Sequence, residues 1–182
     1  MQRTMAPSPT SSPKRSQGRM NRVFPHAGEF RTTPAPSSPG SFGAVRKHDV
    51  HTGVDLYCPD GTPVVAAERG TVIAVVPFTG PGTDPPSPWW NPTRAILVEG
   101  VDHVLCYGEV LSHVEVGDVV QPGQAIGSVL RVLKEDKGRP TSMLHFEMYE
   151  RGTTEPVWWH PGEEKPPHLL DPTHFILRLL RC

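Results

Sequence analysis

The chain has 182 residues and a formal net charge of -1 with its nine histidines counted neutral, a size that suits one domain with additional segments. The near-neutral charge argues against a nucleic-acid partner, which usually needs a basic surface. No apolar run approaches the roughly 18 residues that a membrane span requires, so no span is expected. The 22 prolines and 17 glycines predict many turns and loops.

Residues 1–40 are rich in Pro, Ser, Thr and Arg, and no acidic residue precedes Glu29. The segment has no apolar periodicity, which predicts a disordered or loosely ordered N-terminal segment. It also lacks the apolar core of a secretory signal, so the sequence alone points to the cytoplasm by default. We expect an ordered domain over residues 41–182.

Strand signals dominate this domain. Short apolar, β-branched runs alternate with turn residues, which predicts an all-β antiparallel sandwich or barrel-like fold. Residues 77–93 contain too many prolines for a regular element and predict a long loop. Pro172 suits the first turn of a short C-terminal helix. The expected strands lie within residues 61–77, 94–111, 114–130 and 144–150.

One expected strand, TSMLHFEMY at residues 141–149, has two unlike faces. Alternation places Leu144 and Phe146 on a core face, and Met143, His145 and Glu147 on the other. A half-buried strand with a polar outer face would explain this pattern without any ligand. Glu147 is accordingly expected to be an exposed strand charge, or else to orient a ligand beside it.

A second motif, HTGVD, supplies candidate metal ligands. His51 and Asp55 are four residues apart and share one face of either a helix or a strand, and the β-rich surroundings favour the strand. Gly53 lies between them and would clear space. A distant His145 could complete two histidines and one carboxylate, the usual protein ligands of a catalytic zinc site.

The three cysteines leave their pairing open. Cys58, Cys106 and Cys182 form no CxxC motif, which argues against a cysteine zinc knuckle. Cys58 and Cys106 could form a disulfide in an oxidising compartment, or they could be buried free thiols.

Several motifs occur in the order of a known family. SFGAVR, HTGVD, GTPV-A---GTV, VEVGDVVQPGQAIG and LHFE, between about Ser41 and Tyr149, resemble the lysostaphin-type zinc endopeptidases, and LLDPTHFI resembles their closing segment. The resemblance implies an antiparallel β domain with a central groove and zinc held by His51, Asp55 and His145. It also implies a peptide or cell-wall fragment as ligand and a location that is usually outside the cytoplasm.

The chain departs from this family at two positions. The family reads HxH where this chain has Met143-Leu144-His145, and Y-x-H where it has Tyr107-Gly108-Glu109. Both catalytic histidines of the family are therefore replaced if the resemblance holds at these positions. A thioether is only a weak acceptor, so Met143 can neither move a proton nor donate a hydrogen bond.

Two functions follow from these departures. The chain could be a zinc-binding domain with altered or lost catalysis that binds a peptide or cell-wall fragment. Alternatively, it could be an active zinc metallo-endopeptidase in which Glu109 is the general base, because a carboxylate is a suitable base beside an activated water. HTGVD followed by Cys58 is also similar to the leukocyte cell-derived chemotaxin branch, which implies that the fold can serve non-proteolytic roles.

Two further observations complete the sequence-based expectations. Trp89 and Trp90 in the long loop could stack on a substrate, or they could anchor the loop on the domain. VEVGDVVQPGQAIG also resembles the hairpins of biotinyl and lipoyl carriers, but a carrier needs a lysine at a tight turn. No lysine lies between Lys47 and Lys134, so the carrier interpretation is not favoured.

Overall fold

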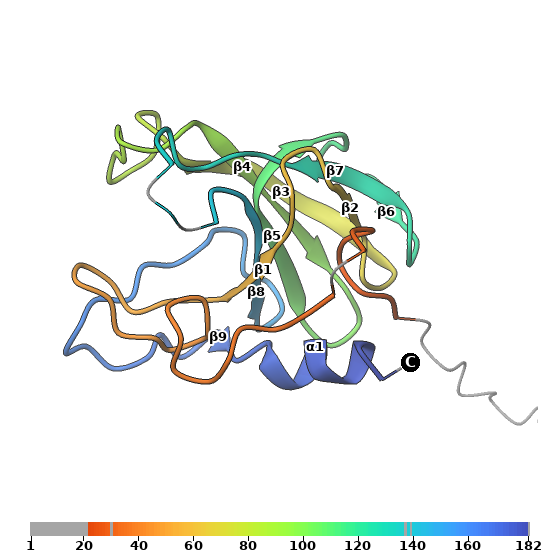
Figure 1. The fold of residues 1–182 in the computed structure, drawn as a ribbon. Coiled ribbons are helices and arrows are strands. Elements are labelled where there is room, and N and C mark those ends of the chain that lie inside the picture. The colour runs from red at the N-terminus through yellow and green to blue at the C-terminus, as the bar shows by residue number, and fades with distance from the viewer. Residues whose placement is uncertain (1–21, 30, 137, 139, 182) are drawn as a thin grey trace, which may run out of the picture.

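The computed structural model describes residues 22–29, 31–136, 138 and 140–181. In this part of the chain nine antiparallel strands form one sheet, and a short helix follows near the C-terminus (Figure 1). The predicted all-β antiparallel class and terminal helix are therefore confirmed. The elements are β1 (Val54–Tyr57), β2 (Pro63–Val65), β3 (Gly70–Thr79), β4 (Thr93–Glu99), β5 (Val104–Ser112), β6 (Val119–Val120), β7 (Ala125–Val129), β8 (Met143–Tyr149), β9 (Leu169–Leu170) and α1 (Thr173–Leu179).

Strand β5 is the centre of the sheet. The order is β1-β8-β5-β4-β3-β6, and β7 links β2 to β5 while β9 pairs with β8. The first part of β5 pairs with β8 as far as Gly108, and its last part pairs with β7 from Val110 onward. The change of partner therefore falls at Glu109, where the register against β4 also shifts.

Both faces of β5 are buried, which explains its nearly continuous apolar sequence. Leu105 and Tyr107 belong to the larger hydrophobic core, and Val104 and Cys106 belong to a second cluster on the opposite face. Val110 returns to the larger core because the irregularity at Glu109 breaks the two-residue alternation.

Strand β8 keeps the alternation that its sequence predicts. Leu144 and Phe146 are fully buried in the larger core, where Phe146 stacks on Phe175 of α1 with ring centroids 6.0 Å apart. His145 and Glu147 occupy the other face. Both are buried rather than exposed, because side chains from other segments, among them His51, Thr52 and Phe78, pack on that face.

The start of the predicted proline-rich loop is wrong by a few residues. Strand β3 continues through Pro77 to Thr79 instead of ending at residue 77. The β3–β4 register shifts between Pro77 and Thr79, and such an irregularity accommodates a residue that has no N–H to donate. The loop itself then spans residues 80–92.

The N-terminal segment also departs from its prediction. Phe24 and His26 are buried, and His26 forms a bridge with Val64 of β2. Backbone bonds from Val23 N–H to the Ala67 carbonyl and from Val65 N–H to the Pro25 carbonyl, 2.8 and 2.9 Å long, fix the segment. Residues 22–27 are therefore packed rather than loosely ordered, because one short apolar stretch pairs with an edge strand. The same prediction for residues 1–21 lies outside the described residues.

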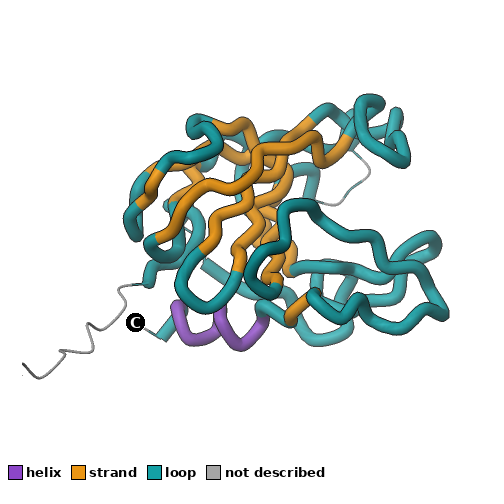
Figure 2. The backbone as a smooth tube through the Cα atoms, turned by 180° about the vertical axis from the view of Figure 1, so that it is seen from behind, coloured by secondary structure: helices purple, strands orange, loops and turns teal. Residues whose placement is uncertain are grey.

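The long loops project from the same end of the sheet (Figures 1 and 2). The loop 80–92 is tied to residues 131–134 by bonds such as the one from Asn91 N–H to the Val132 carbonyl, 2.8 Å. Cys58 and Cys106 are free thiols, and Cys182 lies outside the described residues. Among the helices that the structure describes, none is long and apolar enough to cross a membrane.

Candidate metal centre and the pocket around it

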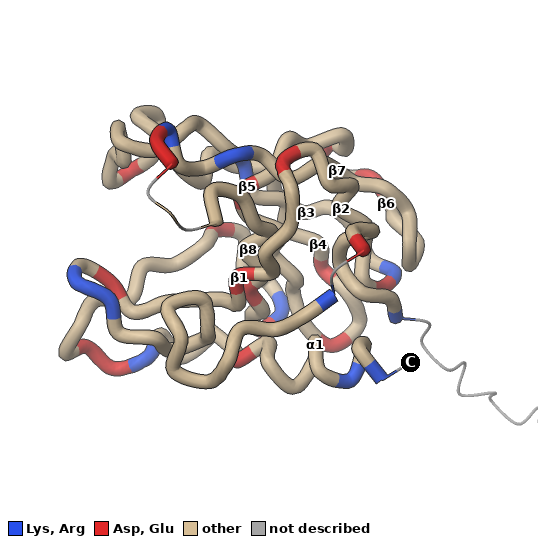
Figure 3. Tube along the Cα trace, in the orientation of Figure 1, with Lys and Arg blue, Asp and Glu red and all other residues tan. Residues whose placement is uncertain are grey.

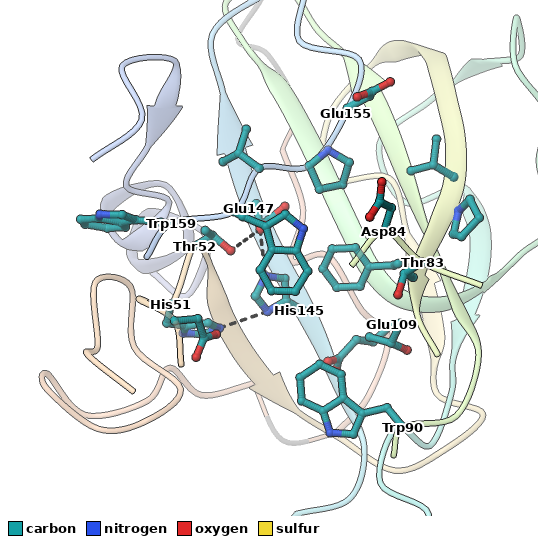
Figure 4. Close-up of a pocket in the computed structure, with 18 of the residues that line it drawn as sticks. His51, Thr52, Thr83, Asp84, Trp90, Glu109, His145, Glu147, Glu155 and Trp159 are labelled. Atoms are coloured by element: carbon teal, nitrogen blue, oxygen red, sulfur yellow. Dashed lines mark hydrogen bonds and ion pairs between the residues drawn. The ribbon is translucent and has the colours of Figure 1, made fainter. Parts of the chain in front are cut away.

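Three side chains converge where β1 meets β8. Asp55 and His145 face each other across the antiparallel ladder, and His51 immediately precedes β1. Asp55 Oδ1 lies 3.0 Å from His145 Nδ1 and 3.1 Å from His51 Nε2, and the two ring nitrogens are 3.1 Å apart. The fold thus brings together the three candidate ligands that the sequence suggested, in a group that could hold a metal ion. Figure 4 shows two of them, His51 and His145, facing each other.

The outward nitrogens of both rings have partners that fix the tautomers. His51 Nδ1 lies 2.9 Å from the Ser41 carbonyl, which can only accept, so this nitrogen carries the proton. His145 Nε2 lies 3.1 Å from the Glu147 carboxylate and donates to it in the same way. In the neutral rings, the two remaining nitrogens therefore turn lone pairs toward Asp55.

This donor set fits a zinc ion. Two imidazole lone pairs and one carboxylate oxygen form an electron-rich triangle with sides of 3.0–3.1 Å. Ligand atoms of tetrahedral zinc, each about 2.0–2.1 Å from the metal, are separated by about 3.3 Å. The three ligand atoms would therefore need to move only slightly apart to hold a zinc ion.

The electrostatics of the trio favour a positive charge. Burial would raise the pKa of Asp55, but the adjacent His145 and His51 lower it below its usual range. Burial would lower the pKa of His145, but the carboxylates of Asp55 and Glu147 raise it to about 10. A group of buried carboxylates that attracts a proton so strongly also stabilises a cation in the proton's place.

Further side chains hold the trio in position. Arg46 donates to Asp55 Oδ2 over 3.1 Å, which leaves Oδ1 directed at the histidines. Glu147 accepts from Thr52 Oγ1 at 2.5 Å and from Tyr149 O–H at 2.8 Å while it orients His145. Glu147 is 1% exposed, so the expectation of a solvated charge is wrong and its orienting role is the one the structure shows.

Gly53 allows His145 to approach. A Cβ at this position would lie 2.8 Å from His145 Nε2 and 2.6 Å from the Phe146 carbonyl oxygen. Both distances are shorter than ordinary contacts, so any side chain would push β1 away from β8. The space that the sequence assigned to Gly53 is therefore filled by the metal-site histidine itself.

Glu109 lies in the same pocket, at the irregular point of β5. Its φ of +65° is a left-handed conformation, which is costly for a non-glycine residue. Its side chain is 8% exposed, and its buried Oε2 has no hydrogen-bond partner. Burial and the nearby charge of Asp55 raise the pKa of Glu109 to about 8.

Met143 shares its face of β8 with His145 and pairs with Tyr57 across the ladder. It is largely buried, and its thioether offers neither a proton nor a strong acceptor. The position two residues before His145 therefore carries no acid, base or hydrogen-bond donor.

The pocket has a volume of about 410 Å³ and is bounded by residues of several loops (Figure 4). Of the two tryptophans predicted to contact a ligand, Trp90 lines this pocket, whereas Trp89 lines a smaller neighbouring pocket with Lys134. Their substrate-binding role remains a prediction. Other lining residues include Arg46, His51, Thr52, Phe78, Asp84, Glu109, His145, Glu147, Glu155, Trp158 and Trp159.

Sequence reasoning missed three supporting residues. Tyr149 carried a usable signal, because it is two residues from Glu147 and shares its face of β8. Thr52 and Arg46 carried none, because their contacts join segments that are far apart in the chain or lie in a loop.

An antiparallel β domain with a buried His, Asp and His trio beside a pocket fits a metallopeptidase-type domain. A sequence profile described as peptidase family M23 matches residues 49–157, more than half of the chain. The chain therefore belongs to peptidase family M23. Among curated protein sequences, none matches it significantly.

Solved structures share the fold. The catalytic domain of a mutant of the prophage-encoded M23 protein EnpA from Enterococcus faecalis is similar with a TM-score of 0.52 and 21% identity, over 79% of this chain and 98% of that one. The antimicrobial peptidase lysostaphin from Staphylococcus simulans gives a TM-score of 0.50 and 21% identity, over 82% of this chain and 50% of that one. At these identities the likeness concerns the fold alone, and this chain spans half the length of lysostaphin.

Proposed function

We propose that this chain is a zinc-binding domain of the M23 family that binds a peptide or cell-wall fragment in its pocket, with peptide hydrolysis altered or lost. The observation that carries the proposal is the combination of a complete His, Asp and His trio with a thioether and a carboxylate at the two positions where the resemblance expects histidines. His51, Asp55 and His145 would hold the zinc.

The chain's own residues can prepare the metal site. Arg46 restrains Asp55, and Glu147 fixes the tautomer and orientation of His145. Bound there, zinc would polarise a carbonyl group and lower the pKa of a water molecule. The aromatic and polar side chains that line the pocket suit a peptide ligand.

Hydrolysis requires more than the metal site. A base must take a proton from the attacking water, and a donor must stabilise the developing oxyanion. Met143 can supply neither function. Removal of one such donor typically lowers the rate by about 100- to 1000-fold, which favours binding over efficient turnover.

One observation favours a second candidate, an active zinc metallo-endopeptidase that cleaves peptidoglycan-type peptide bonds. Glu109 lines the same pocket as His51 and His145, and its Oε2 has no partner within the described structure. A carboxylate so placed could accept the proton of the attacking water. In this candidate Glu109 is the catalytic base.

Metal analysis and hydrolysis assays test both candidates. Protein purified without chelators is expected to contain about one zinc per chain, and His145→Ala is expected to lose it. His113→Ala is the matched control, because His113 is exposed and its backbone N–H, not its ring, donates to the Ile126 carbonyl. Failure of the unmodified protein to take up zinc would refute the site assignment.

The same protein is then incubated with peptidoglycan and with glycine-rich peptides. Binding without hydrolysis supports the first candidate. Hydrolysis that requires zinc and disappears in Glu109→Gln supports the second.

A further inference from the structure

Among the charged side chains that line the pocket beside the trio, acidic groups predominate. Among the described residues, its lining contains the carboxylates of Asp49, Asp84, Glu109, Glu147 and Glu155, but a single guanidinium, that of Arg46. These acidic positions come from separate parts of the chain, and Figure 3 shows how Asp and Glu are distributed along the whole trace. With Asp55 included there are six carboxyl groups. Even without Glu109, whose pKa is about 8, the other five outnumber the three positive charges that Arg46 and a divalent ion would supply together.

Arg46 is already engaged. Its guanidinium donates to Asp55 and to the Pro39 carbonyl, and it lies 3.6 Å from Asp49. Its direct contacts therefore compensate Asp55 and Asp49, whereas it acts on Glu109 only through its charge. The remaining negative potential of the pocket is available to a ligand.

Glu109 is an acidic residue of this pocket that can contact a ligand directly. Its side chain is more than nine-tenths buried, it lines the pocket, and its Oε2 has no partner in the described residues. Figure 4 shows the carboxylate among the lining side chains, on the side of Trp90. An unpartnered buried carboxylate oxygen is destabilising unless a donor reaches it, so a ligand that brings one gains a charge-assisted hydrogen bond.

The walls of the pocket suit the same kind of ligand. Phe78, Trp90 and Trp158 line it together with the acidic groups. Aromatic faces attract cations, and the attraction is stronger where water is partly excluded. A pocket that combines carboxylates with aromatic rings therefore recognises a positively charged group rather than an anion.

We propose that the pocket contains a subsite for a primary ammonium group, in which Glu109 Oε2 is the anchor. The inference rests on the proposed function, because it specifies the ligand that the M23 pocket selects: a peptide that carries a free α-amino group or a lysine-type side chain. A primary ammonium fits better than a guanidinium, since a single buried oxygen offers one-point contact whereas a guanidinium prefers a bidentate partner.

Four peptides of equal length test the proposal on the zinc-loaded full chain. The first is a glycine-rich peptide with an acetylated N-terminus and an amidated C-terminus. The second has the same sequence with a free N-terminus. The third is capped at both ends and carries one central lysine, and the fourth carries the N-ε-acetylated form of that lysine. Isothermal titration calorimetry gives the four dissociation constants.

We expect at least one ammonium-bearing peptide to bind at least 10-fold more tightly than its acetylated counterpart. The second and third peptides identify whether an α-amino group or a side-chain amine is selected. In Glu109→Gln, which keeps the shape and removes the charge, the ratio is expected to fall toward one while zinc content and the affinity for the neutral peptide stay unchanged. Glu150→Gln is the matched control, because Glu150 is exposed and lies outside the pocket.

The outcomes separate this inference from the function on which it rests. Equal binding of all four peptides to the unmodified protein would refute the ammonium subsite and leave the peptide-binding function intact. Absence of binding by every peptide would refute both. A preference for the ammonium that persists unchanged in Glu109→Gln would refute Glu109 as the anchor. The comparison of the four peptides on the unmodified protein does not depend on the stability of any variant.

Discussion

Replacement of Gly53 by alanine is expected to weaken both the sheet and the metal centre. The added Cβ would lie 2.6 Å from the Phe146 carbonyl oxygen, 2.8 Å from His145 Nε2 and 2.9 Å from Glu147 Cγ. Ordinary contacts of a Cβ begin near 3.4 Å, so the backbone of β1 or β8 would have to move.

The direction of this movement follows from the sheet. β8 lies between β1 and β5, and Phe146 pairs with Tyr107 on the β5 side. The Phe146 carbonyl therefore cannot retreat without disturbing the centre of the sheet, whereas the short strand β1 can separate from β8. That separation would pull Asp55 away from His145, its partner across the ladder.

The size of the effect can be estimated. Overpacking of a tight interior site costs about 1–3 kcal/mol in the free energy of unfolding. For a chain of this length, 1 kcal/mol corresponds to a change in Tm of about 2–4 °C. Gly53→Ala is therefore expected to lower Tm by about 2–12 °C and to reduce zinc content below that of the unmodified protein.

Thermal unfolding followed by circular dichroism, together with elemental analysis of the purified variant, measures both effects. Gly82→Ala is the matched control, since a Cβ there meets no atom within 4 Å. A Gly53→Ala protein with the Tm and the zinc content of the unmodified protein would refute the reasoning.

Three further predictions concern the N-terminal segment and Glu109. Phe24→Ala is expected to lower the free energy of unfolding by about 3 kcal/mol in urea titrations, because Phe24 is only 3% exposed. The matched truncation Val45→Ala, at a site that is 76% exposed, should have little effect. Equal effects of the two changes would contradict the packing of residues 22–27. Burial and the charge of Arg31 lower the pKa of His26 from 6.5 to about 4. As the pH drops, this histidine is therefore protonated in the unfolded chain before it is protonated in the folded protein. The free energy of unfolding should fall as the pH drops from about 6.5 to about 4. His26→Gln should flatten this dependence, and an unchanged slope would exclude His26 as its source. Glu109→Gln is expected to leave the affinity for a neutral, doubly capped peptide unchanged, with no hydrolysis before or after the change. The double variant Met143→His with Glu109→His should then create hydrolysis. If the unmodified protein hydrolyses the peptide and Glu109→Gln lowers that rate about 100-fold with zinc retained, Glu109 is instead the base.

The sequence contained the elements of the sheet and the residue types of the metal centre. Alternation along residues 143–149 predicted which side chains enter the core, because the two-residue period of a strand is a local property. The spacing of His51, Gly53 and Asp55 likewise predicted a shared face. Where a strand is long or regular, the local pattern is sufficient to predict which side chains share a face.

Burial was less accessible to sequence reasoning. Glu147 was expected to be exposed, yet Thr52, Tyr149 and His145 surround its carboxylate. Composition suggested a loosely ordered segment up to residue 40, yet a short stretch around Phe24 pairs with β2. In both cases the decisive partners come from other parts of the fold, and a local pattern carries no information about them.

The sequence by itself indicated the class of fold and the candidate ligands His51, Asp55 and His145. Through the family resemblance it also predicted the two departures at Met143 and Glu109, because such a comparison depends on residue identity and order alone. Only the tertiary structure decided how the trio is oriented and what surrounds it. His51 and His145 are 94 positions apart, and His145 and Asp55 are 90 apart, so their approach depends on the pairing of β1 with β8. The left-handed backbone, burial and unpaired oxygen of Glu109 likewise arise only where β5 changes its partner from β8 to β7, since that change of pairing turns a carboxylate into the pocket and removes it from water.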